Sequence, residues 1–289
     1  MALHEESSEL DPESSAHCSI TSGRFCLSEE RYSEALDHFK RALEIQQKYF
    51  LPNNPSLADT HEYIGSTYYK QDEFEQALFH HLKALEIEQN SLPDDHDSIA
   101  TSYFNISKDY IGLSIWSDAL EYGLKAIEQL HKSSQADVDT LTKYTRHIAE
   151  IYLKRNEYDK ALSYYKEVLD MSLIHIPDGN HALVGIYYPI AKTYYRLKRY
   201  DEALSYFQKS LDIELKTLPD NAKTISKTYF DISTSYVGLE QFEEALVAMN
   251  KAYEQLLKTL PHNHHEVVTV RDSLDKLQII LISREERRK

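Results

Sequence analysis

The chain has 289 residues and a formal net charge of −15, from 32 lysines and arginines against 47 aspartates and glutamates. An acidic chain is a poor candidate for binding nucleic acid or an anionic membrane, because phosphate contacts need a basic surface. No run approaches the roughly 18 consecutive apolar residues of a transmembrane helix, and the acidic first 13 residues lack the apolar core of a signal peptide. We therefore expect a cytoplasmic protein without nucleic-acid or membrane partners.

Residues 1–13 are expected to form a disordered acidic tail. The tail is either simply solvated or folds back onto a binding groove and competes with ligand. After it come Cys18 and Cys26, eight residues apart on one predicted helix. That separation is roughly 12 Å, beyond disulfide reach. We expect both cysteines to pack as small apolar side chains in a reducing compartment.

The dipeptide Ala-Leu then recurs at a fixed interval of 42 residues. It stands at Ala35-Leu36, Ala77-Leu78, Ala119-Leu120, Ala161-Leu162, Ala203-Leu204 and Ala245-Leu246. A period of this size marks a repeat array, in which each repeat must stack on its neighbours to bury its apolar face. Positions in each repeat are numbered here from this Ala as position 0.

Each repeat has the apolar pattern of two helices joined by a short turn. Position −12 is always small, position −9 is a Tyr in five repeats, and position −3 is always aromatic, including the single tryptophan, Trp116. This spacing is typical of amphipathic helices. It predicts first helices at 14–27, 56–70, 98–112, 140–154, 182–196 and 224–238. It predicts second helices at 31–49, 73–91, 115–132, 157–175, 199–217 and 241–259. A capping helix over 266–289 should cover the end of the array.

The repeat resembles the tetratricopeptide repeat, in which a small residue, a Tyr, an Ala and an aromatic residue stand at these offsets. The resemblance covers roughly residues 14–265, and each repeat is eight residues longer than the 34-residue form. The longer repeat, with its Leu-Pro loop, looks like the repeats of kinesin light chains. The resemblance implies an all-α, right-handed superhelical solenoid of six helix pairs, with the first helices lining a concave groove.

On the first helices, positions −18, −15, −11, −8 and −7 form one stripe facing this groove. In repeats three to six the stripe supplies seven cations against one acid, Glu150, although Asp231 lies on the adjacent stripe. The cations are Lys108, Lys143, Arg146, Lys154, Lys192, Arg196 and Lys227. Position −15 adds the aromatic residues Phe104, Tyr188 and Phe230. The stripe predicts a basic, aromatic groove; alternatively, it is an ordinary helix surface whose aromatic residues pack between neighbours.

Such a groove suits an acidic peptide that also carries a large apolar side chain. Micromolar binding needs about 8 kcal/mol, whereas a charge-assisted hydrogen bond contributes roughly 1.5–3 kcal/mol, so apolar anchors must supply the remainder. We assign charge recognition to Lys143, Arg146, Lys192 and Arg196. We assign anchoring and backbone contact to Phe104, Tyr188, Phe230 and Asn105.

The predicted groove is similar to that of kinesin light chains, a family that binds tryptophan-plus-acid motifs in a basic groove. That family pairs two asparagines at positions −15 and −14, of which only Asn105 matches here, while Asp231 replaces another. The sequence also has no heptad segment for joining a motor heavy chain, so we do not expect a motor subunit.

We expect no enzyme, cofactor or metal site, because the sequence has no phosphate loop, nucleophile elbow or HExxH motif. The best metal candidate is the loop cluster of His262, His264, His265 and Glu266, which equally suits a polar loop. The sequence thus favours a non-enzymatic scaffold that binds protein or peptide segments. The alternatives are a structural spacer, or a regulatory repeat module of a larger protein that binds an oligopeptide signal.

Overall fold

The computed structural model describes residues 11–94, 96–132, 137–177, 179–217 and 222–288. All regular elements in this part of the chain are helices. The chain divides into two compact units, Met1–Ile151 and Tyr152–Lys289, each described here by itself. Among the helices described, none is long and apolar enough to cross a membrane.

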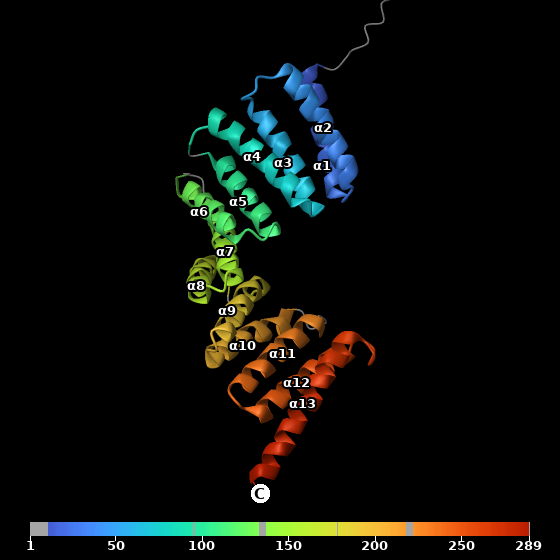
Figure 1. Cartoon of the computed structure of the whole chain (residues 1–289), viewed down its shortest axis with the longest axis vertical. Coiled ribbons are helices and arrows are strands. Elements are labelled where there is room, and N and C mark those ends of the chain that lie inside the picture. The colour runs from blue at the N-terminus through green and yellow to red at the C-terminus, as the bar shows by residue number, and fades with distance from the viewer. Residues whose placement is uncertain (1–10, 95, 133–136, 178, 218–221, 289) are drawn as a thin grey trace, which may run out of the picture. The chain divides into compact units, whose positions relative to one another are not determined.

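Six helix pairs follow one another, as the sequence predicts (Figure 1). The first helices are α1 (Pro12–Ser28), α3 (Pro55–Lys70), α5 (Asp97–Gly112), α7 (Val138–Lys154), α9 (Val184–Arg196) and α11 (Ala222–Gly238). The second helices are α2 (Tyr32–Tyr49), α4 (Phe74–Ser91), α6 (Trp116–Lys132), α8 (Tyr158–His175), α10 (Tyr200–Thr217) and α12 (Phe242–Leu257). The last helix is α13 (His265–Arg288), and a short 3-10 turn, His181–Leu183, precedes α9. Every described end lies within two residues of its prediction, which confirms the all-α repeat solenoid.

The first helix begins earlier than predicted. Asp11 caps α1 by accepting a hydrogen bond from the Ser14 amide, 2.9 Å long, and Pro12 occupies the first turn, where its missing amide proton costs nothing. Residues 11–13 therefore belong to the helix and its cap instead of the predicted tail. Residues 1–10, and with them the predicted competition with ligand, lie outside the described residues.

The turn within each pair has the same backbone geometry. Position −5 has a positive φ of 58–62° in all six repeats, although no residue there is glycine: Glu30, Asp72, Ser114, Asn156, Lys198 and Glu240. The next amide donates to the carbonyl of position −9, as Arg31 does to Cys26 over 2.9 Å. This left-handed residue and its hydrogen bond end the first helix and reverse the chain at the same place in every repeat.

The small residue at position −12 lets the two helices of a pair approach closely. A Cβ atom built on Gly65 would lie 2.6 Å from the ring of His81, and one on Gly23 would lie 2.6 Å from the ring of Phe39. His81 and Phe39 both stand at position +4 of the second helix. Glycine provides this room in the first two repeats, whereas the fourth and fifth repeats combine Ala149 with Tyr165 and Ala191 with Phe207 at the same two positions.

Replacing Gly65 by Ala is expected to lower the free energy of unfolding by about 1–3 kcal/mol, because the new methyl group must displace the buried His81 ring. Urea unfolding followed by circular dichroism measures the loss. Gly185→Ala is the control, since a Cβ atom there meets nothing within 4 Å. Equal losses in the two variants would contradict the close-approach argument.

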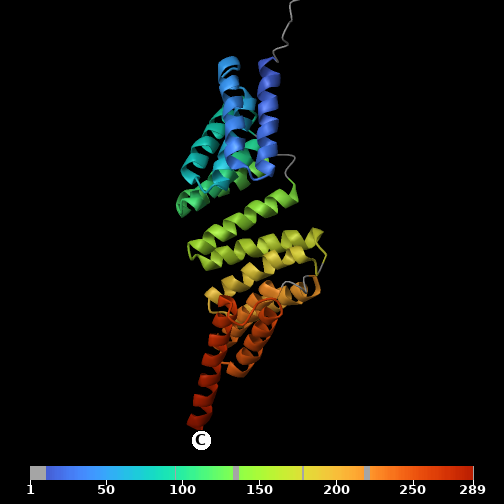
Figure 2. The same cartoon turned by 90° about the vertical axis from the view of Figure 1, so that its right-hand side faces the viewer.

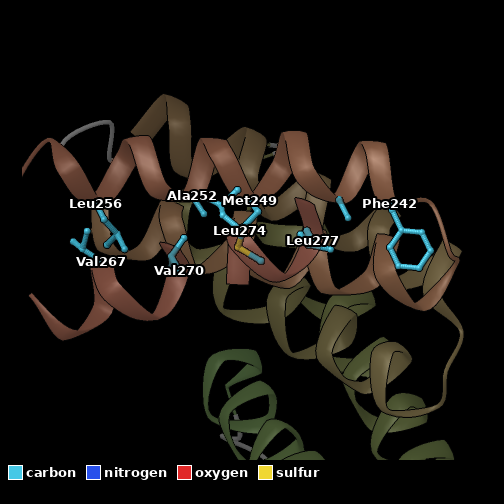
Figure 3. Close-up of a cluster of buried hydrophobic side chains, with 9 residues drawn as sticks. Phe242, Met249, Ala252, Leu256, Val267, Val270, Leu274 and Leu277 are labelled. Carbon is cyan, nitrogen blue, oxygen red and sulfur yellow. The ribbon is translucent and has the colours of Figure 1, made fainter. Parts of the chain in front are cut away.

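The second unit ends in an apolar core between α12 and α13 (Figure 3). Met249 and Leu256 of α12 pack with Val270, Leu274 and Leu277 of α13. Figure 2 shows α12 and α13 running side by side, so α13 covers the end of the stack as the sequence predicts.

One cysteine differs from its prediction. Cys26 is buried at 4% exposure, as expected, but Cys18 is exposed, so its predicted packing role is wrong. In later repeats the same position, −17, holds Thr60, Ser102 and Thr228, each fully buried next to the preceding repeat. No described helix precedes α1 to cover Cys18 in the same way.

Candidate functional site

Five of the predicted residues gather around one pocket in the first unit. The first-helix pocket lies among α3, α5 and α7 and has a volume of about 340 Å³. It is lined by Tyr69, Phe104, Asn105, Lys108, Ile111, Lys143, Arg146, His147 and Glu150. Because first helices supply every side chain, the repeat register alone places these residues together.

Phe104 forms the floor of the first-helix pocket. Its ring stacks on that of Tyr144, with centroids 4.1 Å apart and planes 5° from parallel, and lies 4.7 Å from the ring of His147. Phe104 is only 6% exposed. It is therefore a fixed apolar surface at the base of the pocket.

Two lysine ammonium groups lie over aromatic rings of this pocket. The Nζ atom of Lys108 is 4.3 Å from the ring centroid of Tyr69, and the Nζ atom of Lys143 is 4.8 Å from that of Phe104. Cation–π contacts of this kind hold the ammonium groups in place. With Arg146, three cations line the pocket against the single carboxylate of Glu150, so the lining is positive in an acidic chain.

His147 is a neutral member of the pocket wall. Burial, reinforced by the positive charges of Lys108 and Lys143, lowers the pKa of His147 to about 4. The Ser107 hydroxyl donates its proton to the carbonyl of Ala119 over 2.5 Å, so it must accept a hydrogen bond from Nε2 of His147, 2.8 Å away. The proton of His147 is thus on Nε2, and Nδ1 is left as an acceptor.

Neighbouring first helices contact each other through a fixed pair of positions. Position −15 of one repeat meets position −14 of the next in three places. These are Glu62 with Asn105, Phe104 with His147, and Tyr188 with Asp231. The Asn105 amide donates one N–H to Glu62 over 3.2 Å, which leaves its second N–H and its carbonyl oxygen for a ligand. His147 was not among the predicted pocket residues, although its position, −14, lies on the adjacent stripe that contains Asp231.

In the second unit, Asp231 binds two of the predicted residues. The Tyr188 hydroxyl donates to Asp231 over 2.5 Å, and the Lys192 ammonium lies 2.9 Å from the other carboxylate oxygen. Burial, with the nearby charge of Asp231, raises the pKa of Tyr188. The positive charge of Lys192 is therefore compensated by the carboxylate of Asp231, which lies on α11.

Lys227 and Phe230 line a second pocket, between α11 and the last two helices. This capping-helix pocket has a volume of about 500 Å³ and includes Leu256 and Val270. Lys223 and Glu266 form an ion pair of 2.7 Å at its rim. Lys227 also lies 5.0 Å from the ring centroid of Tyr188. The capping helix α13 contributes four of the ten lining residues of this pocket, a contribution that was not predicted from the sequence.

Three predicted cations, Lys154, Lys192 and Arg196, line neither pocket. Lys154 and Arg196 are the last residues of α7 and α9, and both are exposed. Position −7 is thus too close to the turn for these side chains to line the pockets described above.

The histidine cluster before α13 has a structural arrangement. Nδ1 of His264 accepts a hydrogen bond from the Glu266 amide, 3.3 Å long, at the start of α13, and Glu266 pairs with Lys223. Among the residues described, no group of three or more His, Cys, Asp or Glu side chains is placed to hold a metal ion.

Comparison with protein families identifies the repeats. Tetratricopeptide repeat models match residues 16–90, 60–132 and 182–258, and a second model of the same description matches residues 147–216. No curated protein matches the sequence.

Solved structures share the fold at low sequence identity. One of them is a Podosopora anserina protein described as a kinesin light chain, whose TPR-like repeats are nearly identical to one another. It gives a TM-score of 0.64 at 15% identity, and the match covers 72% of this chain and 98% of that one. The apo form of RapI gives 0.73 at 16% identity, with coverages of 88% and 68%. YrrB, a TPR protein with an unusual peptide-binding site, gives 0.53 at 18% identity, with coverages of 81% and 97%. The family models match well over half of the residues, and the chain belongs to the tetratricopeptide repeat family.

Proposed function

We propose that the chain is a non-enzymatic scaffold of the cytoplasm whose first-helix pocket binds an extended acidic segment of a partner protein. The observation that carries this proposal is the pocket itself: Lys108, Lys143 and Arg146 surround an aromatic floor. A carboxylate of the ligand would meet these cations, while a large apolar side chain would cover the edge of Phe104. YrrB supports the proposal as a member of the same fold with a peptide-binding site.

The rigidity of the site supports this assignment. Phe104, Tyr144 and His147 are buried, with Phe104 stacked on Tyr144 and in contact with the tilted ring of His147. The two lysines are held over rings before any ligand arrives. Preorganisation lowers the entropic cost on the protein side of the complex, so that mainly the peptide must become ordered. The aromatic floor also supplies the apolar contact that charge pairs at an exposed surface cannot replace.

The test is fluorescence anisotropy of a labelled peptide that carries one Trp among Asp and Glu. The Lys143→Glu, Arg146→Glu variant is expected to bind at least about 10-fold more weakly, because two attractive contacts become repulsive. Binding by the native chain should also weaken as salt is raised.

The matched control is Lys83→Glu, Lys125→Glu, which changes the net charge equally on the second helices α4 and α6. In the native chain these lysines pair with Glu86 and Glu121. Equal weakening in both double variants would reduce the effect to global charge and contradict the site. If the native chain binds no peptide, a chain lacking residues 1–10 separates a competing tail from a true absence of binding. That deletion keeps the Asp11 cap of α1 intact.

A further inference from the structure

The sixth repeat lacks an aromatic side chain that most other repeats have. The ring is missing where positions −16, −9 and +3 meet. In the third repeat Tyr122, at position +3, lies 6.0 Å from the ring of Tyr103 and 5.5 Å from that of Tyr110. The fifth repeat reproduces this cluster, with Tyr206 at 6.0 Å from Tyr187 and 5.6 Å from Tyr194. In the second repeat His80 takes the same place between two rings, and in the fourth Tyr164 stacks on Tyr152.

The sixth repeat has the two outer tyrosines without the central ring. Tyr229 and Tyr236 stand at positions −16 and −9, but position +3 is Ala248. A pocket of about 340 Å³ opens there, and we name it the tyrosine pocket. It is lined by Gln208, Tyr229, Ile232, Tyr236, Glu243, Glu244, Val247, Ala248 and Lys251.

We propose that the tyrosine pocket is a second binding site, which takes a tyrosine side chain of a partner protein in the place that the repeat's own ring occupies elsewhere. The earlier repeats are the template, because they show that a ring fits between positions −16 and −9 at stacking distance. This site lies outside the first-helix pocket and does not depend on the function proposed for it.

The charged groups around the tyrosine pocket fit the same ligand. At position +6, Lys125 lies 4.9 Å from the central ring of the third repeat, and Lys209 lies 5.0 Å from that of the fifth. Lys251 is the equivalent residue in the sixth repeat, and its ammonium group lies 5.6 Å from the ring centroid of Tyr229. Lys209 has the same distance, 5.6 Å, to the ring centroid of Tyr187 in the fifth repeat. An incoming ring would therefore meet an ammonium group already in position.

The rim favours a phenol. The carboxylates of Glu243 and Glu244 can accept a hydrogen bond from a phenolic hydroxyl, which a phenyl ring lacks. Val247, 57% exposed beside the opening, extends the apolar contact to the residue that bears the ring.

The experiment follows the methyl resonances of Ala248 and Ile232 in the full-length chain as p-cresol, the tyrosine side-chain analogue, is added. Both resonances are expected to shift in a saturable manner, with a dissociation constant on the order of millimolar for so small a probe. The saturated analogue 4-methylcyclohexanol should bind at least several-fold more weakly. Shifts spread evenly over all repeats, or equal binding of the saturated analogue, would overturn the proposal.

Two variants place the site. Ala248→Tyr restores the pattern of the other repeats and should abolish the Ile232 shift while keeping or raising the melting temperature. Tyr229→Thr removes one wall and should also abolish it; Thr145 stands at this position in the fourth repeat, so the substitution is compatible with the fold. Unchanged p-cresol binding in folded protein of either variant would overturn the site.

A gain-of-function variant tests the template directly. Tyr206→Ala should create a second p-cresol site in the fifth repeat beside Lys209, and p-cresol should raise the melting temperature of that variant. Sedimentation of the native chain distinguishes the source of the ring. Self-association that Ala248→Tyr abolishes would identify the occupant as a tyrosine of a second copy and overturn the assignment to a partner protein.

Discussion

Replacing Asp109 by Thr is expected to lower the free energy of unfolding of the first unit by about 3–5 kcal/mol. Asp109 is fully buried and lies 2.5 Å from Nδ1 of His81, which is 2% exposed. Within the described part of the chain, the other carboxylate oxygen of Asp109 and Nε2 of His81 have no hydrogen-bond partner. Each group thus depends on the other, and removing one leaves a buried polar ring or carboxyl without compensation. Urea unfolding followed by the fluorescence of Trp116, which lies in this unit, measures the loss.

The double variant His81→Phe, Asp109→Thr separates loss of the pair from loss of packing. Phe39 stands at the position of His81 in the first repeat and faces Gly23 as His81 faces Gly65. Thr67 and Thr193 stand at the position of Asp109 in other repeats and are fully buried. The double variant should therefore recover to within about 1 kcal/mol of the native chain, since an apolar replacement of a buried pair is often neutral. If the double variant lost as much stability as the single variants His81→Phe and Asp109→Thr lose together, the pair would have no coupling energy.

Replacing Glu88 by Gln is expected to raise the free energy of unfolding by up to about 3 kcal/mol at pH 8. Glu88 is 3% exposed, and burial raises its pKa to about 7, even though the Ser102 hydroxyl donates to it over 2.6 Å. Between about pH 4.5 and pH 7, the native state thus holds a proton on Glu88 that the unfolded chain, with the ordinary pKa of 4.5, has released. Above pH 7, the native state must hold the buried carboxylate in its charged form. The carboxyl therefore destabilises the fold progressively as the pH rises from about 4.5 to about 7, and fully above that range.

A glutamine is compatible with this position. Gln46 stands at the equivalent position, +11, in the first repeat and donates to Ser56, whose equivalent in the third repeat is Ser98. The expected signature is a gain in urea midpoint at pH 8 that shrinks toward zero near pH 4.5. Glu86→Gln, which changes the same charge on the exposed side of α4, should not reproduce it. A gain that does not change with pH would assign the effect to packing and contradict the raised pKa.

The helices were predictable because every repeat encodes the same two amphipathic segments and the same turn. One register read from Ala35 to Ala245 fixes each helix end to within two residues. The basic stripe was predictable for the same reason: helical geometry alone brings Lys108 and Lys143 to one face, and the structure gathers them with Arg146 around the first-helix pocket.

The partners of these side chains depend on contacts between different repeats. Lys192 meets Asp231, and Asn105 meets Glu62, because the residues face each other across two first helices. A stripe drawn along single helices cannot show that the next helix supplies a neutralising carboxylate. The tyrosine pocket had a sequence signal, Ala248 in a column of histidines and tyrosines, but its meaning depends on knowing that positions −16, −9 and +3 pack together.

The contact between positions −15 and −14 also constrains how the groove can change over evolution. Its pairs, Glu62 with Asn105 and Tyr188 with Asp231, are each 43 residues apart, one residue more than the repeat. A substitution of one residue of a pair leaves its partner without a matching hydrogen-bond group, so we expect tolerated substitutions to occur in both residues together. Among relatives, residues should covary at this spacing along the first helices. A new ligand specificity would then arise by exchanging residues across the border of two repeats, and not within a single repeat.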